Sequence, residues 1–290
     1  MDATAPIRPR RSMLFVPGNN AKALKKAPDL DCDGIIIDLE DAVGPSDKVK
    51  AREAALEAVD SGFDGKETLV RINGVDSPWH HDDIEALGGA CVHGLVVPKV
   101  QSAAEIYALN DAMTEAGAPD EMAIWAMIET PLGVLRADEI AATSARLAGF
   151  LLGLEDLSKA LNANRDSDRN QVSYALQRVV MAARAYDLIA LDSPTLAYKD
   201  EAQCQAEAQQ ARAIGYDGKC AIHPSQIATI NQAFSPTKAE LEDAKRIIDA
   251  FESAQSAGQG IATLDGKLIE AMHVEAATKL ALMERAINGR

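Results

Sequence analysis

Cysteine is scarce in this sequence, and long apolar runs are absent from it. None of the cysteines belongs to a CxxC motif or a Cys/His cluster, the patterns typical of zinc sites; they are Cys32, Cys91, Cys204 and Cys220. Widely spaced cysteines favour reduced thiols and therefore a cytoplasmic location. No apolar run approaches the roughly 20 residues needed to cross a bilayer. Residues 1–10 contain two prolines and no apolar segment, so we expect a mobile tail rather than a signal peptide.

Basic residues are outnumbered by acidic ones. The chain has 29 Lys and Arg against 44 Asp and Glu, and its formal net charge is −15. This excess argues against binding to nucleic acid or to an acidic membrane, because both require basic patches. An anionic substrate would need local cations, and the N-terminal third of the chain contains candidates: Arg10, Arg11, Lys22, Lys25 and Lys26.

Glycine-rich nucleotide-binding motifs are also missing, since no GxGxxG or P-loop follows an apolar run. Short apolar runs instead alternate with longer amphipathic segments. The runs are continuously apolar, as in strands buried on both faces of a parallel sheet: Met13–Val16, Gly34–Asp38, Thr68–Ile72, Gly94–Pro98, Ala123–Ile128, Ala148–Leu152, Leu188–Leu191 and Cys220–His223. The segments predicted to be helices include Asp47–Val59, Ala103–Ala116, Gln171–Ala185 and Glu201–Ile214. This order predicts an α/β fold, a (β/α)8 TIM barrel over residues 11–235, more than an open doubly wound sheet.

The pattern changes after the eighth unit. Pro236–Ser256 is predicted to be a long polar helix, and Ile269–Ala286 a final helix. Ala257–Thr263, between them, is rich in small residues and contains two glycines. A glycine-rich link before a terminal helix predicts that residues 236–290 form a mobile extension acting as a lid.

Polar residues follow most of the predicted strands, at the end where barrel enzymes carry their active sites. Carboxylates predominate among them, without His or Cys pairs. This composition favours a hard cation, Mg²⁺ or alternatively Mn²⁺, over zinc. The residues that would converge on the barrel mouth are Phe15, Asp38, Glu40, Asp41, Arg71, Asn73, Lys99, Glu129, Glu155, Asp156, Asp192 and His223.

Seven segments in register resemble the citrate lyase β-subunit-like family, which includes malyl-CoA and citramalyl-CoA lyases and relatives of HpcH-type aldolases. They are RSMLFVPGNN (11–20), IIIDLEDAV (35–43), VRIN (70–73), VVPKV (96–100), AMIETPLGV (126–134), GLEDLS (153–158) and AIHPSQI (221–227). The resemblance implies a TIM barrel, Mg²⁺, coenzyme A as part of the substrate, a 2-oxo acid partner and a homotrimer or hexamer.

The resemblance also implies roles for individual residues. Glu129 and Asp156 would bind the metal, although each could instead cap a helix. Arg71 would face the substrate carbonyls, and a salt bridge to Asp38 or Glu40 is an alternative compatible with that role. Asp38 and Glu40 would then orient Arg71 and metal-bound waters. Coenzyme A would meet the region after the first strand, for which the alternatives are core packing and a solvated helix face; the candidates are Phe15, Arg11, Lys22 and Lys25.

One position departs from the family's lyase pattern. Lyases of the family carry an aspartate acid/base in a motif like GxMIDxP on a lid, and the corresponding stretch here is GKLIEA (266–271). Glu270 matches that aspartate but is one methylene longer. Asp265 is a rival, and Glu270 could simply be a carboxylate at a helix N-terminus.

Three functions remain open from the sequence. The first is a carbon–carbon lyase or synthase acting on a 3-hydroxyacyl-CoA, such as malyl-CoA or citramalyl-CoA, with acetyl-CoA or propionyl-CoA as product. The second is a thioesterase of the same kind of CoA ester. The third is a citrate lyase β subunit, or a non-catalytic CoA-binding subunit, working in a complex. The acid pair with Arg71 argues against a binding module that lacks catalysis.

Overall fold

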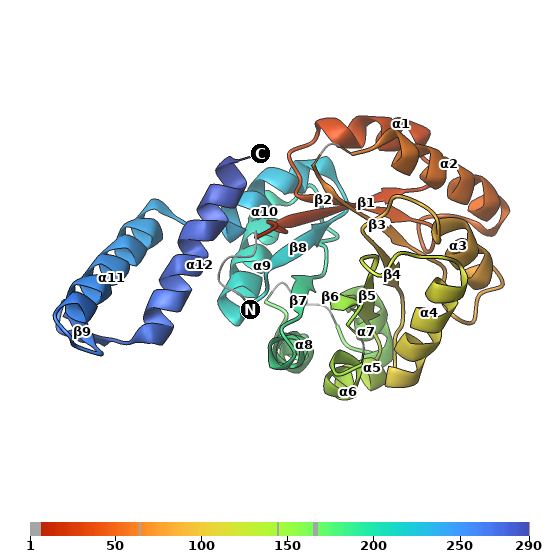
Figure 1. Ribbon diagram of the computed structural model, residues 1–290. Helices are drawn as coiled ribbons and strands as arrows, with labels where there is room; N and C mark the ends of the chain where they lie inside the picture. Colours follow the sequence, from red (N-terminus) through yellow and green to blue (C-terminus); the bar gives the residue numbers. More distant parts are fainter. Residues whose placement is uncertain (1–6, 64, 144, 165–167, 290) are drawn as a thin grey trace. The chain divides into compact units, whose positions relative to one another are not determined.

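The computed structural model of the protein describes residues 7–63, 65–143, 145–164 and 168–289. Its centre is a closed barrel of parallel strands, in which each strand pairs with the next along the chain and β1 pairs with β8 (Figure 1). The strands are β1 (Ser12–Pro17), β2 (Gly34–Asp38), β3 (Glu67–Arg71), β4 (Gly94–Val97), β5 (Ala123–Ile128), β6 (Leu147–Leu152), β7 (Ile189–Asp192) and β8 (Gly218–Ala221). The predicted TIM barrel is confirmed, and every strand boundary lies within two residues of its prediction.

Helices connect successive strands and cover the outside of the barrel (Figure 1). They are α1 (Ala21–Lys26), α2 (Lys48–Ser61), α3 (His80–Leu87), α4 (Ala103–Glu115), α5 (Pro131–Leu135), α6 (Ala137–Ala141), α7 (Leu154–Leu161), α8 (Ser173–Ala185), α9 (Glu201–Ile214) and α10 (Ile227–Phe234). Short 3-10 turns accompany them: η1 (Ala27–Asp29), η2 (Pro45–Asp47), η3 (Asn170–Val172) and η4 (Pro224–Gln226). None of the helices within the described ranges is both long and apolar enough to cross a membrane.

Alternate residues of each strand point to opposite sides of the barrel wall. One set fills the interior as a single apolar cluster: Met13, Ile36, Leu69, Val96, Trp125, Met127, Leu151, Leu191 and Cys220. The intervening residues, such as Leu14 and Ile35, belong to the larger core that packs against the helices. A strand-end residue therefore reaches the barrel mouth only if it shares the alternation of the interior set. Phe15, Asp38, Arg71 and Glu129 do so.

The chain divides into two compact units, of which Arg10–Phe234 is the barrel and the other contains Ser235–Arg290. The first six residues of the expected N-terminal tail lie outside the described residues. Arg10, expected in that tail, groups with the barrel unit, and its Nη2 donates to Glu67 Oε1 at 2.8 Å.

The C-terminal unit consists of α11 (Lys238–Ser256), a hairpin of β9 (Ala262–Leu264) and β10 (Lys267–Ile269), and α12 (Ala271–Asn288). The two helices run side by side (Figure 1). Phe251, Ala254, Ala262 and Ile269 form its small core. The hairpin was not predicted. Its turn residues Asp265 and Gly266 have φ values of 50° and 76°, the left-handed conformation that tight hairpin turns require.

Candidate active site

Arg71 and Asp38 form a buried ion pair at the barrel mouth. They end the neighbouring strands β3 and β2 and lie opposite each other in the sheet register. Arg71 Nε donates to Asp38 Oδ1 and Nη2 to Oδ2, each at 2.6 Å, in the two-pronged geometry that arginine makes with a carboxylate. Burial raises the pKa of Asp38, but the hydrogen bonds and charge of Arg71 outweigh it, and the pKa stays below its usual range.

The remaining edge of the Arg71 guanidinium is less tightly engaged. Nη1 lies 3.2 Å from Glu40 Oε2 and 3.8 Å from Met127 Sδ. The guanidinium carbon stands 4.9 Å from the centre of the Phe15 ring, a cation–π contact. Arg71 is therefore oriented by Asp38 and Phe15, and it lines the cavity. The predicted salt bridges of Arg71 to both Asp38 and Glu40 are present.

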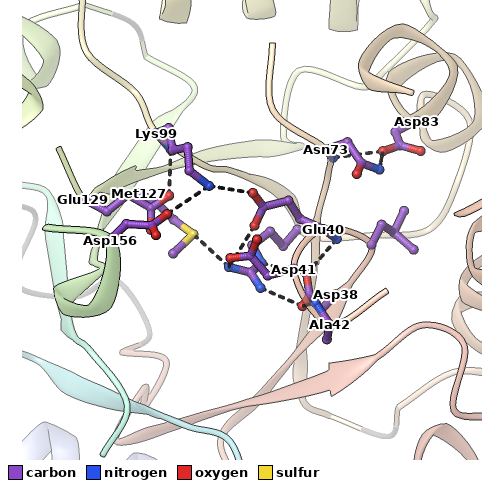
Figure 2. A network of polar contacts seen from close by, with 12 residues as sticks. Asp38, Glu40, Asp41, Ala42, Asn73, Asp83, Lys99, Met127, Glu129 and Asp156 are labelled. Atoms are coloured by element: carbon purple, nitrogen blue, oxygen red, sulfur yellow. Dashed lines mark hydrogen bonds and ion pairs between the residues drawn. The ribbon is translucent and has the colours of Figure 1, made fainter. Parts of the chain in front are cut away.

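Lys99 links the carboxylates on the other side of the mouth (Figure 2). Its Nζ lies 2.8 Å from Glu40 Oε1 and 3.0 Å from Asp156 Oδ2. Its backbone N–H donates to Glu129 Oε1 at 2.9 Å. Lys99 has a φ of 57°, a left-handed conformation that non-glycine residues rarely adopt. Backbone strain of this kind is concentrated at active sites.

Glu129 is more deeply buried than Asp156, the other member of the acid pair. It is 4% exposed. Burial raises its pKa to about 7, although the charges of Lys99 and Arg71 oppose the rise. Gly153, which follows β6, makes room for it, because a Cβ at Gly153 would lie 2.2 Å from Glu129 Oε2. The glycine of the GLEDLS segment is thus required by the close approach of the carboxylate.

Neither acid acts as the helix cap that the sequence left open. Thr130 caps α5, and its hydroxyl accepts the N–H of Gly133 at 3.0 Å. Gly153 is the N-cap of α7, and Asp156 lies in the first turn of that helix with its side chain 34% exposed. Both carboxylates therefore remain available to the cavity.

A cavity of about 370 Å³ opens at this end of the barrel. Its lining is charged on one side and largely apolar on the other: Phe15, Pro17, Asp38, Asp41, Ala42, Arg71, Met127, Glu129, Leu151, Leu152, Gly153, Leu154, Glu155, Asp156, Ser193, Pro194, Cys220 and Ile222. Glu40 and Lys99 touch this lining through Arg71 and Asp156. Most of the strand-end residues predicted from the sequence thus converge in the structure.

The donor set fits Mg²⁺ rather than zinc. Among the described residues, no group of three or more His, Cys, Asp and Glu side chains is placed to share a metal. Glu129 and Asp156 offer carboxylate oxygens, and two protein carboxylates with water and substrate is a usual arrangement for Mg²⁺. The Lys99 ammonium beside Asp156 shows that this side of the mouth attracts a cation.

Two of the predicted positions need correction. Asp192 has the opposite alternation to Leu191 and points away from the barrel interior. It is fully buried between Arg169 Nη1 and Lys219 Nζ, each at 2.8 Å. Asn73 turns to α3, where its amide donates to Asp83 Oδ2 at 2.6 Å (Figure 2). Neither residue lines the cavity.

The structure gives no support to the prediction that Arg11 contacts coenzyme A. Arg11 precedes β1 and therefore lies at the N-terminal end of the barrel, opposite the mouth. It is buried and forms a fork with Asp33, Nε to Oδ2 at 2.9 Å and Nη2 to Oδ1 at 2.8 Å. Phe15 does line the cavity. Lys22 and Lys25 are exposed on α1, after the mouth end of β1, and their role stays a prediction.

Two further candidates are not among the residues that line the cavity. His223 precedes η4, accepts the N–H of Ser225 at 3.2 Å, and packs its ring 4.7 Å from that of Tyr198. Glu270 is exposed at the start of α12, and its N–H donates to His273 Nδ1 at 3.1 Å. Its rival Asp265 pairs with Arg246. The role of Glu270 stays a prediction.

Sequence reasoning missed several lining residues. Gly153, Met127, Ser193 and Cys220 belong to the cavity but are not charged, so a search for polar strand ends passes over most of them. Strand alternation was the available signal, because each shares the alternation of the interior set.

The fold and the mouth define a class of enzyme, a (β/α)8 barrel with an acid pair and a buried arginine at the C-terminal ends of its strands. The profile of the HpcH/HpaI aldolase/citrate lyase family matches residues 11–224, and the chain belongs to that family.

Relatives of known function are similar along nearly the whole chain. A (3S)-malyl-CoA thioesterase of Cereibacter sphaeroides is 41% identical over 96% of each chain. The citrate lyase β subunit of Leuconostoc mesenteroides is 36% identical over 91% of this chain and 89% of its own. The crystal structure of CitE from Mycobacterium tuberculosis with magnesium, acetoacetate and coenzyme A has a TM-score of 0.78 and 30% identity, and covers 94% of this chain and 97% of the other.

Proposed function

We propose that the protein is a Mg²⁺-dependent thioesterase of a 3-hydroxyacyl-CoA that carries a second carboxylate, with (3S)-malyl-CoA as the leading substrate. The geometry that carries the proposal is the Arg71 guanidinium, held by Asp38 at the wall of a cavity that also contains Glu129 and Asp156. The similarity to (3S)-malyl-CoA thioesterases supports it, because such a relative is 41% identical whereas the citrate lyase β subunit of Leuconostoc mesenteroides is 36% identical. Glu270, in place of the lyase aspartate, favours hydrolysis over carbon–carbon cleavage.

Glu129 and Asp156 would hold the metal and, through it, the hydroxy acid end of the substrate. When bound, Mg²⁺ would supply charge neutralisation and fix the orientation of a chelating hydroxyl and carboxylate. Lys99 keeps both acids in place, through its N–H to Glu129 and its ammonium to Asp156. These contacts orient the carboxylates before substrate arrives.

Arg71 would bind the thioester carbonyl oxygen. When water attacks the thioester carbon, negative charge develops on that oxygen, and a fixed cation beside it stabilises the transition state. The new C–O bond forms first and gives a tetrahedral oxyanion; when the carbonyl re-forms, the C–S bond breaks and the departing thiolate takes up a proton to give free coenzyme A. Asp38 and Phe15 hold the guanidinium in place, so little reorganisation is needed during the reaction.

The attacking water must lose a proton to a base at the mouth. Asp41 lines the cavity, its side chain is 64% exposed, and its carboxylate lies 3.8 Å from Arg71 Nη1. It is therefore near the group that would hold the thioester and is accessible to water. We assign it the role of proton acceptor in the proposed hydrolysis. The pantetheine portion would pass Phe15, and Lys22 and Lys25 would face the phosphates of coenzyme A.

A carbon–carbon lyase is the second candidate, favoured by the similarity to citrate lyase β subunits. In that reaction the same Arg71 would stabilise a thioester enolate, and Glu270 would protonate the enolate carbon. Glu270→Gln would then reduce 2-oxo acid formation by about 10²–10⁴-fold, the usual contribution of one proton-transfer group.

Product analysis separates the two candidates. The purified full chain is incubated with Mg²⁺ and (3S)-malyl-CoA, and free thiol and 2-oxo acid are measured separately. Hydrolysis gives thiol and malate without glyoxylate. Formation of glyoxylate without free thiol would mean that the protein is a lyase and not a thioesterase.

A further inference from the structure

Ser193 carries a buried hydroxyl that no described residue satisfies. It follows β7, is 1% exposed and lines the catalytic cavity. Its Oγ has no hydrogen-bond partner among the residues that the structure describes. A buried polar group without a partner is unfavourable, and its presence in a folded protein calls for an explanation.

The position of Ser193 in the barrel is distinctive. In a closed ring of eight strands, β7 lies directly across from β3, so Ser193 faces the cavity from the side opposite Arg71. Its neighbours in the lining are apolar and include Leu151, Cys220 and Ile222. Every other hydrogen-bonding side chain in this lining is charged, if the thiol of Cys220 is set aside.

The backbone of Ser193 is fixed from behind the sheet. Lys219 Nζ donates to the Ser193 carbonyl oxygen at 2.5 Å. The same ammonium pairs with Asp192 Oδ2 at 2.8 Å and Glu207 Oε2 at 3.2 Å, and its side chain is fully buried. Because this ion network holds the peptide, the Ser193 side chain keeps its place at the cavity wall.

We infer that Ser193 Oγ donates a hydrogen bond to the substrate carboxylate, so that Ser193 is a binding residue that selects acyl groups bearing an acid. The inference rests on the proposed function, which places the thioester oxygen at Arg71. A short substrate that spans the cavity then brings its carboxylate end to the opposite wall. Mg²⁺ would hold one side of that carboxylate, and an oxygen that the metal leaves free still needs a donor, which the apolar neighbours of Ser193 do not offer.

Binding of (S)-malate, the acid that hydrolysis would release, tests this without turnover. The full chain is titrated calorimetrically with malate in the presence of Mg²⁺. Ser193→Ala is expected to bind malate about 10- to 100-fold more weakly, the usual contribution of a hydrogen bond to a charged group. Ser193→Cys keeps the shape of the side chain and is slightly larger, but its thiol donates poorly, so it should resemble Ser193→Ala. Ser158→Ala is the matched control, because Ser158 Oγ is also buried and unpartnered but lies outside the cavity lining.

Four results would overturn the inference. Wild-type affinity in Ser193→Ala means that the hydroxyl does not contact the acid, and wild-type affinity in Ser193→Cys means that only its volume matters. A lower melting temperature in Ser193→Ala than in Ser158→Ala means that the hydroxyl is structural. If the wild-type chain does not bind malate, Ser193 has no carboxylate ligand of this kind. The proposed function is judged separately by thiol release from malyl-CoA: no thiol release together with weakened malate binding in Ser193→Ala rejects the thioesterase and keeps the role of Ser193.

Discussion

Replacement of Gly153 by alanine should displace Glu129, one of the two acids of the proposed metal site, while both Glu129 and Asp156 remain in the sequence. A Cβ at this position would lie 2.2 Å from Glu129 Oε2 and 2.5 Å from Glu129 Cβ, whereas ordinary contacts of this kind begin at 3.4 Å. The backbone of Gly153 has φ −105° and ψ 94°, which alanine adopts without strain. The effect of the substitution is therefore steric and is directed at Glu129.

The geometry sets the size of the expected loss. The carboxylate must retreat by about 1 Å to restore an ordinary contact, and a displacement of that size at a catalytic group can reduce the rate by about 100-fold. Loss of metal orientation should weaken Mg²⁺ binding by about 10–100-fold, as for residues that position metal ligands. Crowding should also lower the free energy of unfolding by about 1–3 kcal/mol.

Calorimetric titration with Mg²⁺ measures the loss of metal affinity, and thermal unfolding without metal measures the loss of stability. Gly89→Ala is the matched control, because a Cβ there would have no neighbour within 4 Å. The control should bind Mg²⁺ as the wild type does. If Gly153→Ala also binds Mg²⁺ with wild-type affinity, Glu129 is not a ligand, and the assignment of the metal site fails.

Three further predictions concern other contacts in the barrel. Arg71→Lys should lower kcat by about 10²–10³-fold, because a point ammonium cannot reproduce the fork to Asp38; a change confined to KM would make Arg71 a binding residue instead. Asp192→Asn should lower the free energy of unfolding by about 3–5 kcal/mol in denaturant titrations, because it leaves the buried Arg169 without its carboxylate and Lys219 with Glu207 alone; an unchanged midpoint would mean that the ion network contributes nothing. Burial raises the pKa of Cys220 to about 12, so its thiol stays protonated at about pH 8. Iodoacetamide should then modify the exposed Cys91 and leave Cys220 intact by mass spectrometry, and equal labelling would contradict the burial of Cys220.

The barrel was predictable because each of its strands is a continuous apolar run bounded by turns. The β9–β10 hairpin was not, because its strands are short and largely exposed, so they carry little apolar pattern. Its signal was the Asp265-Gly266 pair, a sequence that favours tight hairpin turns. The glycines before it, Gly258 and Gly260, instead match the pattern of a flexible link.

Residues of the site could be predicted where a polar residue lies at the end of a strand and also shares the alternation of the interior set, as Asp38, Arg71 and Glu129 do. It was not predictable where polarity was considered without alternation. Asp192 is polar and ends a strand, yet it faces the helices, where Arg169 and Lys219 neutralise it. These partners come from distant parts of the chain, and only the folded structure brings them together.

The ratio of free coenzyme A thiol to 2-oxo acid, formed from (3S)-malyl-CoA by the Mg²⁺-loaded full chain, tests the central claim most directly. Both products are followed over the same time course, with Glu129→Gln and Asp156→Asn chains as controls that keep the side-chain volume. We expect thiol and malate in equal amounts, no glyoxylate, and loss of activity in both control chains. Glyoxylate with acetyl-CoA in place of thiol and malate, or full thiol release by the control chains, would contradict it.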